Sequence, residues 1–262
     1  MENTTKPMPV VFFGHGTPMN AIWQNAYTRS WAKIGAEMPR PKAIVMVSAH
    51  WYTRGTWVTG QANPETVYDF GGFTELENVV YPAPGDPALA ARLKELLIPT
   101  EVGIDNEEWG FDHGTWSVLI HAFPKADVPV IQLSIDGTKP ASFHYELAKA
   151  LAPLRDEGYL IAASGNVVHN LRMWVRHQGL NGAYDWAERF EARVKETLES
   201  GDDAALVNYQ TLTPEGRLAV PTPDHYLPLV FMIALRRPGE PIKFPTEGID
   251  GGSISMLSFQ IG

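Results

Sequence analysis

The sequence contains no cysteine among its 262 residues. This absence excludes a disulfide scaffold, a thiolate zinc site and a cysteine nucleophile, so a bound metal would need histidine or carboxylate ligands. The N-terminal residues show no apolar segment followed by a small-residue cleavage site. The apolar runs also fall short of the roughly 20 residues that span a bilayer. We therefore expect a cytoplasmic protein without a membrane segment.

Basic residues are also scarce: 21 Lys and Arg face 30 Asp and Glu, which gives a formal net charge of -9. Nucleic acids are bound through a basic surface, and this charge balance does not favour one. The hydrophobic fraction of 44% is enough for a full core, so the chain is not expected to be disordered. The composition favours a small-molecule ligand.

Apolar segments alternate with amphipathic ones along the chain. Short β-branched or aromatic runs predict buried strands at 9–14, 42–49, 56–59, 128–135 and 159–165, and the alternating tail predicts a last strand. Helices are predicted over 21–38, 87–97, 116–122, 141–154, 184–200 and 225–235. Segment 61–84 is rich in Gly, Pro and aromatics and is predicted to be irregular and functional. The alternation predicts an α/β three-layer sandwich around a mostly parallel or mixed central sheet, as a single domain over 1–262.

Histidines follow several of the predicted strands. His15 follows PVVFFG, His50 follows AIVMVSA, and His169 comes a short turn after YLIAASG. Because ligands of open α/β sheets bind outside the carboxyl ends of the strands, we expect these imidazoles at one edge of the sheet. His113 in WGFDHGTW and His225 in PTPDHYLP lie in loops, where function concentrates. Neutral imidazole is the commonest metal ligand, so an Fe(II) or Zn(II) site is one interpretation.

The other histidines favour a structural interpretation. His144 and His177 fit exposed helix positions, and His121 fits a packed or surface position. A single histidine at a strand end is more often structural than functional, and no HxxxH or HExxH motif places two ligands on one helix. Convergence of the remaining histidines is therefore a hypothesis.

A family resemblance rests on the segments FFGHGTPM, VSAHWY, DHGTWSVL, SGNVVHNL and TPDHYLPL. Together they resemble the DODA-type (LigB-like, class III) extradiol ring-cleavage dioxygenases, and in particular the bacterial 4,5-DOPA extradiol dioxygenase group. The resemblance runs in order from about residue 9 to the C-terminus. It implies an enzyme that opens the ring of an L-DOPA-like catechol by 4,5-cleavage with O2.

The resemblance also implies roles for the histidines. By motif, His15 and His50 match two metal ligands and His225 matches the third, which is a glutamate in the protocatechuate-cleaving relatives. Fe(II) is expected for catalysis, and Zn(II) is the other candidate because a three-histidine site suits it as well. His169 matches the catalytic acid–base histidine or a fourth zinc ligand. His113 matches a second active-site histidine that contacts substrate or oxygen.

Aromatic residues near these motifs are candidate walls of a catechol pocket. Trp51 and Tyr226 are the first candidates, with Tyr68 and Phe70 behind them, although all fit a hydrophobic core equally well. Two other functions fit the same residues: a zinc-dependent hydrolase that activates water, and a non-catalytic metal-binding protein on this scaffold. Metal identity and oxygen consumption discriminate the hydrolase. A His169→Ala variant that kept the function would indicate the binding protein.

Overall fold

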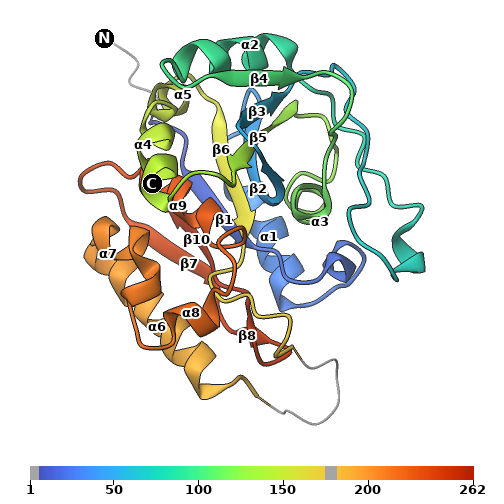
Figure 1. Ribbon diagram of the computed structural model, residues 1–262. Helices are drawn as coiled ribbons and strands as arrows, with labels where there is room; N and C mark the ends of the chain where they lie inside the picture. Colours follow the sequence, from blue (N-terminus) through green and yellow to red (C-terminus); the bar gives the residue numbers. More distant parts are fainter. Residues whose placement is uncertain (1–5, 175–181) are drawn as a thin grey trace.

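The computed structural model describes residues 6–174 and 182–262. Within those ranges the centre is an eight-stranded mixed sheet (Figure 1). Its strands are, in spatial order, β4 (Val102–Asp105), β3 (Thr56–Thr59), β5 (Val130–Asp136), β2 (Ile44–Thr53), β6 (Leu160–Gly165), β1 (Val10–Gly14), β10 (Ser258–Ile261) and β7 (Ile242–Thr246). A small second sheet pairs β8 (Ile249–Asp250) with β9 (Ile254–Ser255).

The strands in the middle of the sheet run parallel. Strand β6 pairs in parallel with β1 on one side and with β2 on the other, and β2 pairs in parallel with β5. Antiparallel pairs lie toward the edges, between β3 and β5, β1 and β10, and β10 and β7. Parallel strands bring their carboxyl ends to a common edge, so residues at or just beyond the carboxyl ends of β1, β2 and β6 lie near one another.

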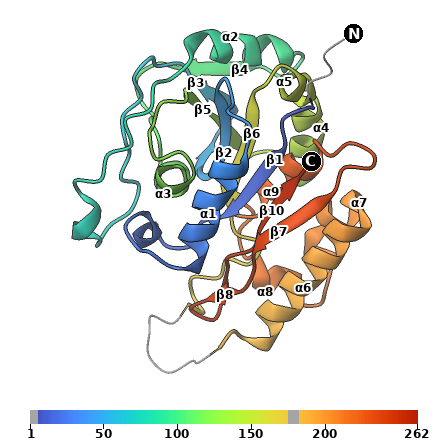
Figure 2. The same ribbon diagram turned by 180° about the vertical axis from the view of Figure 1, so that it is seen from behind.

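Helices cover both faces of the sheet and give three layers (Figures 1 and 2). One face packs against α1 (Ala26–Glu37) and α3 (His113–Ala122). The other packs against a larger set, namely α2 (Pro87–Leu96), α4 (Ala141–Lys149), α5 (Ala152–Asp156), α6 (Asp185–Ser200), α7 (Asp203–Val207), α8 (Gly216–Ala219) and α9 (Leu227–Ile233). Short 3-10 turns lie at η1 (Pro18–Ala21), η2 (Thr74–Leu76) and η3 (Tyr209–Thr211).

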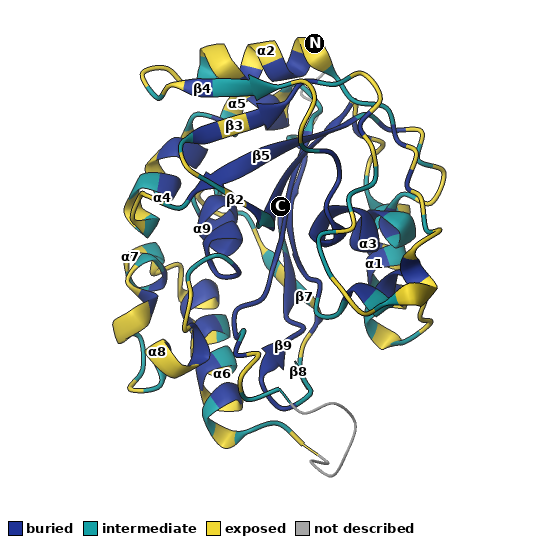
Figure 3. Ribbon diagram, turned by 45° about the vertical axis from the view of Figure 1, so that its right-hand side comes forward, coloured by how far each residue is buried: buried dark blue, intermediate teal, exposed yellow. Residues whose placement is uncertain are grey.

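The strand sequences explain why the sheet is buried on both faces, as Figure 3 shows. Successive side chains of a strand point to opposite faces. In β1, Val10 and Phe12 join one hydrophobic core, whereas Val11 and Phe13 join the other. An uninterrupted apolar run is therefore what a central strand of this sheet requires.

The predicted α/β three-layer fold is confirmed, with differences in detail. The helix predicted over 21–38 begins only at Ala26, because the side chain of Asn25 accepts from the backbone N–H of Thr28 and caps α1 there. The helix predicted over 141–154 ends at Lys149, and α5 begins separately with Pro153 in its first turn. Strands β4 and β7 were not predicted; β7 alternates between partly buried and exposed residues and lacks a long apolar run. In the described ranges, no helix has the length and apolar character needed to cross a membrane.

Candidate metal and catalytic site

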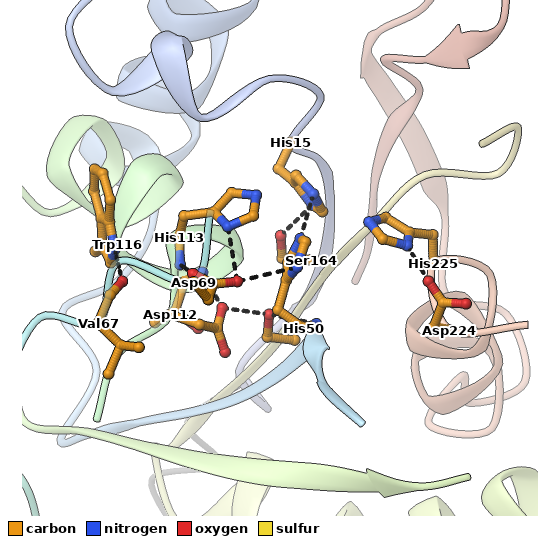
Figure 4. Close-up of polar contacts among 12 residues, drawn as sticks. His15, His50, Val67, Asp69, Asp112, His113, Trp116, Ser164, Asp224 and His225 are labelled. Carbon is orange, nitrogen blue, oxygen red and sulfur yellow. Dashed lines mark hydrogen bonds and ion pairs between the residues drawn. The ribbon is translucent and has the colours of Figure 1, made fainter. Parts of the chain in front are cut away.

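The histidines that follow the strands and those in the loops meet at one edge of the sheet (Figure 4). The ring centroid of His15 lies 5.0 Å from that of His50, 5.6 Å from that of His113 and 5.4 Å from that of His225. The ring of His169 stacks on that of His225, with centroids 3.5 Å apart and planes 5° from parallel. The structure therefore brings together every histidine for which the sequence suggested a functional role.

Each element delivers its histidine for a local reason. His15 follows the last residue of β1, and His50 lies within β2, where the register with β5 shifts between Val47 and Tyr52. His113 is the first residue of α3, directly after the cap Asp112. Beyond β6, the backbone N–H of His169 donates to the carbonyl of Ala219, and a separate antiparallel bridge joins His169 to Ile254 of β9.

The Nδ1 atoms of the two strand histidines are occupied by oxygen partners. Nδ1 of His15 is hydrogen-bonded to Oγ of Ser164 at 2.8 Å, and Nδ1 of His50 lies 3.2 Å from Oδ2 of Asp69. Their Nε2 atoms lie 3.1 Å apart. Such outer partners fix which ring nitrogen faces a metal, so the Nε2 atoms of both rings are the available ligands.

The loop histidines are held in the same way. Nδ1 of His113 donates to Oδ2 of Asp69 at 2.9 Å, and Nδ1 of His225 donates to Oδ2 of its neighbour Asp224. The hydrogen bond from His225 outweighs the opposing effect of burial and lowers the pKa of Asp224 below its ordinary value. Both loop rings are therefore oriented by ionised carboxylates.

Two sets of possible metal ligands lie side by side. The ligand atoms of His15, His50 and His113 lie within 4.8 Å of one another, and so do those of His169, Asp224 and His225. The ring of His225 is also 4.9 Å from that of His50. Figure 4 shows His113 on one side of the His15–His50 pair and His225 on the other. The pair and His113 together offer three nitrogen atoms, a donor set that suits divalent iron or zinc, and His225 lies across the pair from His113.

Burial keeps three of the site histidines uncharged, namely His15, His50 and His169. Burial, followed by repulsion from neighbouring histidines, lowers the pKa of His15 and His50 well below the ordinary value. Burial and then His225 lower the pKa of His169 to about 2. A metal ligand must be deprotonated, so these rings need no proton release before they bind an ion.

A buried carboxylate supports the start of α3. Asp112 is fully buried and accepts hydrogen bonds from Oγ of Ser48 at 2.6 Å and from Nε2 of Gln132 at 2.7 Å. It also accepts from the backbone N–H of Thr115 at 3.1 Å, which caps the helix. Burial and then the charge of Asp69 raise the pKa of Asp112. This network holds the first turn of α3, and with it His113, in place.

The histidines line one wall of a cavity of about 230 Å³. The other described residues around it are mainly apolar or aromatic: Gly16, Thr17, Pro18, Phe70, Phe73, Leu171, Trp174, Asp250 and Ile254. The ring of Phe70 meets that of His113 edge to face, with centroids 5.3 Å apart. The cavity therefore combines nitrogen ligands with walls that suit a flat apolar ring.

Comparison with known proteins identifies the family. A family model described as the catalytic LigB subunit of aromatic ring-opening dioxygenase matches residues 5–248. The chain belongs to this family. It is 55% identical over 260 residues to the 4,5-DOPA dioxygenase extradiol of Escherichia coli (strain K12), covering 97% of this chain and 95% of the relative. It is 36% identical to the protein of the same description from Beta vulgaris, covering 95% and 94%.

The fold of the family is the fold found here. A crystal structure of an uncharacterized protein from Escherichia coli K12 superimposes with a TM-score of 0.86 at 52% identity, covering 97% of this chain and 100% of that chain. The protein is therefore an aromatic ring-opening dioxygenase on a LigB-like α/β scaffold.

Two aromatic residues that the sequence suggested as cavity walls, Trp51 and Tyr226, lie away from the described cavity. Trp51 follows His50 in β2, so its side chain points to the opposite face of the strand, where its ring stacks on that of Trp109. Tyr226 is fully buried in the core, and its hydroxyl donates to the carbonyl of Leu206. Neither lines the described cavity, whereas Phe70 does.

The remaining histidines are placed differently from one another. His121 is partly buried, and its Nε2 is hydrogen-bonded to the carbonyl of Asn20, as a packed position requires. His144 is fully buried, which contradicts the expected exposed position. It lies on the face of α4 that packs against α9. His177 falls outside the described residues.

The residues that orient the histidines were not predicted from the sequence. Asp112 and Asp224 each directly precede a loop histidine, so an Asp-His pair was the available signal for them. Asp69 lies in a different segment from the histidines it contacts, and Ser164 reaches His15 only through the pairing of β6 with β1. No local pattern marks these two residues.

Proposed function

We propose that this dioxygenase opens the ring of an L-DOPA-like catechol by 4,5-cleavage with O2, and that His15, His50 and His225 hold a catalytic divalent iron. The observation that carries the proposal is the 3.1 Å approach of the Nε2 atoms of His15 and His50, whose Nδ1 atoms already have oxygen partners. Rings held in this way are prepared to share one ion. The substrate class is supported by relatives described as 4,5-DOPA dioxygenase extradiol over nearly the whole chain.

We assign the third ligand to His225 from its sequence motif. His113, the other candidate, lies on the opposite side of the His15–His50 pair. Nδ1 of His225 donates to the carboxylate of Asp224, so Nε2 on the other side of the ring is free to bind a metal. Carboxylate–histidine–metal sites in other proteins use the same arrangement. When bound, divalent iron supplies a Lewis acid for the diol and a route for electron density from the ring to O2.

The remaining histidines are proposed to move protons. His169 lines the cavity beside His225, and an unprotonated ring nitrogen there can accept the proton of a catechol hydroxyl. His113, on the other side of the His15–His50 pair, is proposed to take up a proton on Nε2 and then pass it to oxygen during cleavage. Both atoms of O2 enter the product, the ring C–C bond beside the diol breaks, and its two carbons become an aldehyde and a carboxylate.

The cavity walls are proposed to hold the flat ring. Phe70 and Phe73 pack edge to face, with centroids 5.6 Å apart, and both line the cavity with Ile254. Aromatic and branched side chains exclude water from a bound ring and restrict its orientation. We propose that this wall keeps the carbon to be attacked beside the histidines.

The proposal is tested by oxygen uptake with protein rebuilt anaerobically with Fe(II) and then given L-DOPA. The expected result is stoichiometric O2 consumption with a yellow ring-opened product, whose cleavage position is read by mass spectrometry and NMR. If protein that demonstrably holds iron consumes no oxygen with L-DOPA or protocatechuate, the proposed reaction is wrong. Hydrolase activity with Zn(II) would then be the alternative.

Three variants separate the assigned roles. His225→Ala is expected to lose bound metal, whereas His169→Ala and His113→Ala are expected to keep metal and lose turnover. His144→Gln is a matched control, because His144 is a buried histidine that does not line the cavity. Loss of metal from His113→Ala together with its retention by His225→Ala would exchange the roles of these two residues.

A further inference from the structure

One carboxylate, that of Asp69, contacts two of the site histidines on different elements. Its Oδ2 accepts from Nδ1 of His113 at 2.9 Å and lies 3.2 Å from Nδ1 of His50. Its Oδ1 accepts from the backbone N–H of His113 at 2.9 Å. The side chain of Asp69 is 11% exposed, so these contacts are largely shielded from water.

An ionised carboxylate can only accept hydrogen bonds. Nδ1 of His113 donates to Asp69 and so carries hydrogen. We expect hydrogen on Nδ1 of His50 as well, because a lone pair there would face the same carboxylate oxygen at 3.2 Å. This leaves the lone pair of each ring on Nε2. For His50 this nitrogen faces Nε2 of His15, the pair to which the metal is assigned above.

We propose that Asp69 is a positioning residue that sets the tautomer and orientation of His50 and His113 at the same time. The inference rests on the proposed function in assigning His50 to the metal and His113 to proton transfer. A single carboxylate would thus prepare a metal ligand and an acid–base group together.

Asp69 is also the neighbour in sequence of a residue that lines the cavity wall. It lies in the irregular segment between β3 and α2 and directly precedes Phe70, which lines the cavity and packs against His113. Val67, two residues earlier, accepts a hydrogen bond from Nε1 of Trp116 on α3 at 3.0 Å through its carbonyl (Figure 4). The segment is therefore tied to the helix that begins at His113, and the wall and the carboxylate share one support.

The direct test is the tautomer of each histidine in metal-free, full-length protein labelled with 15N-histidine. Two-bond correlation spectra report which ring nitrogen carries the hydrogen. In the wild type we expect hydrogen on Nδ1 of His50 and His113. In Asp69→Ala both rings should shift toward hydrogen on Nε2, while His225 stays unchanged. Unchanged tautomers of His50 and His113 in Asp69→Ala would overturn the proposal.

The second test measures Zn²⁺ affinity by calorimetry. Loss of a partner that orients a metal ligand typically weakens binding by about 10–100-fold, and we expect a loss of this size in Asp69→Ala. His113→Ala should bind Zn²⁺ like the wild type, because it leaves the contact between Asp69 and His50 in place. Glu75→Ala is the matched control, an exposed carboxylate removed from the same segment. Wild-type affinity in Asp69→Ala would contradict the role of Asp69 at His50.

The third test compares kcat with saturating iron. If Asp69 acts through His113, the double variant Asp69→Ala/His113→Ala should be no slower than His113→Ala alone. Losses that multiply would contradict the role at His113. Asp69→Asn keeps the shape of the side chain and should give intermediate losses, which provides a readout if Asp69→Ala does not fold. An inactive wild type would refute the proposed reaction, whereas the tautomer and Zn²⁺ measurements would still decide the role of Asp69.

Discussion

Replacement of His144 by a residue that does not titrate should reduce the sensitivity of the protein to acid. His144 is fully buried on α4, with its ring 5.3 Å from that of Phe143 and 5.4 Å from that of Phe231. Its Nε2 is hydrogen-bonded to the carbonyl of Asp136 at 3.2 Å, and its Nδ1 has no hydrogen-bond partner within residues 6–174 and 182–262. Burial lowers the pKa of His144 to about 4, from an ordinary value of 6.5.

The direction of the effect follows from linkage. Because the folded pKa is below the unfolded one, the unfolded chain binds the proton more tightly, and protonation favours unfolding. The contribution of His144 to stability is therefore complete above pH 6.5 and is lost as the pH falls through 6.5 toward 4. With these two values, His144 alone should account for about 2 kcal/mol of lost unfolding free energy between pH 7 and pH 5.

The assay is urea unfolding of the wild type and His144→Gln at both pH values. Other buried histidines titrate in both proteins, so the difference between their pH dependences isolates His144. We expect His144→Gln to lose about 2 kcal/mol less than the wild type between pH 7 and pH 5, whatever its absolute stability. His144→Phe should show the same reduction. Equal losses in wild type and both variants would refute the argument that burial keeps His144 neutral.

Three further predictions concern the site and the core. Gly114→Ala would place a Cβ 2.9 Å from Cδ2 of His50, so the affinity for Zn²⁺, measured by calorimetry, should fall. Gly71→Ala is the control: its Cβ would have no described atom within 4 Å, and this variant should bind Zn²⁺ like the wild type. Phe70→Ala should raise the KM for catechol about tenfold, from the loss of roughly 1.4 kcal/mol of ring contact, with unchanged Zn²⁺ affinity; equal KM values would exclude Phe70 from the wall. Arg155→Met should lower the unfolding free energy by about 3–5 kcal/mol, because it leaves a largely buried carboxylate without its partner; urea unfolding that matches the wild type would contradict this.

Local sequence patterns predicted the central strands of the sheet better than its edge strands. Largely apolar strands such as β1, β5 and β6, all of whose residues are buried, were predictable because a central strand buried on both faces needs few polar residues. Edge strands were harder. Strand β4 has one buried residue, and β7 alternates with exposed ones, so their pairing depends on a neighbouring strand that supplies hydrogen bonds.

The histidines of the site were predictable from the sequence, but only some of the residues around them were. Histidines just beyond strand ends were expected together because parallel strands share a carboxyl edge, and His15, His50 and His169 do meet there. The walls were not predictable. Adjacent residues of a strand face opposite sides, and that pattern by itself does not tell which side holds a cavity. The sequence therefore did not reveal that Trp51, a candidate wall, faces away from the cavity that His50 lines.

The sequence by itself determined the α/β class, the family and the histidines that gather at one sheet edge, since each depends on residue type and local order. Only the tertiary structure decided that Asp69 reaches both His50 and His113, and that Ser164 holds His15. It also decided that His144 is buried. The physical reason is that hydrogen bonds and burial depend on distances in space, which the fold sets between residues far apart in the chain.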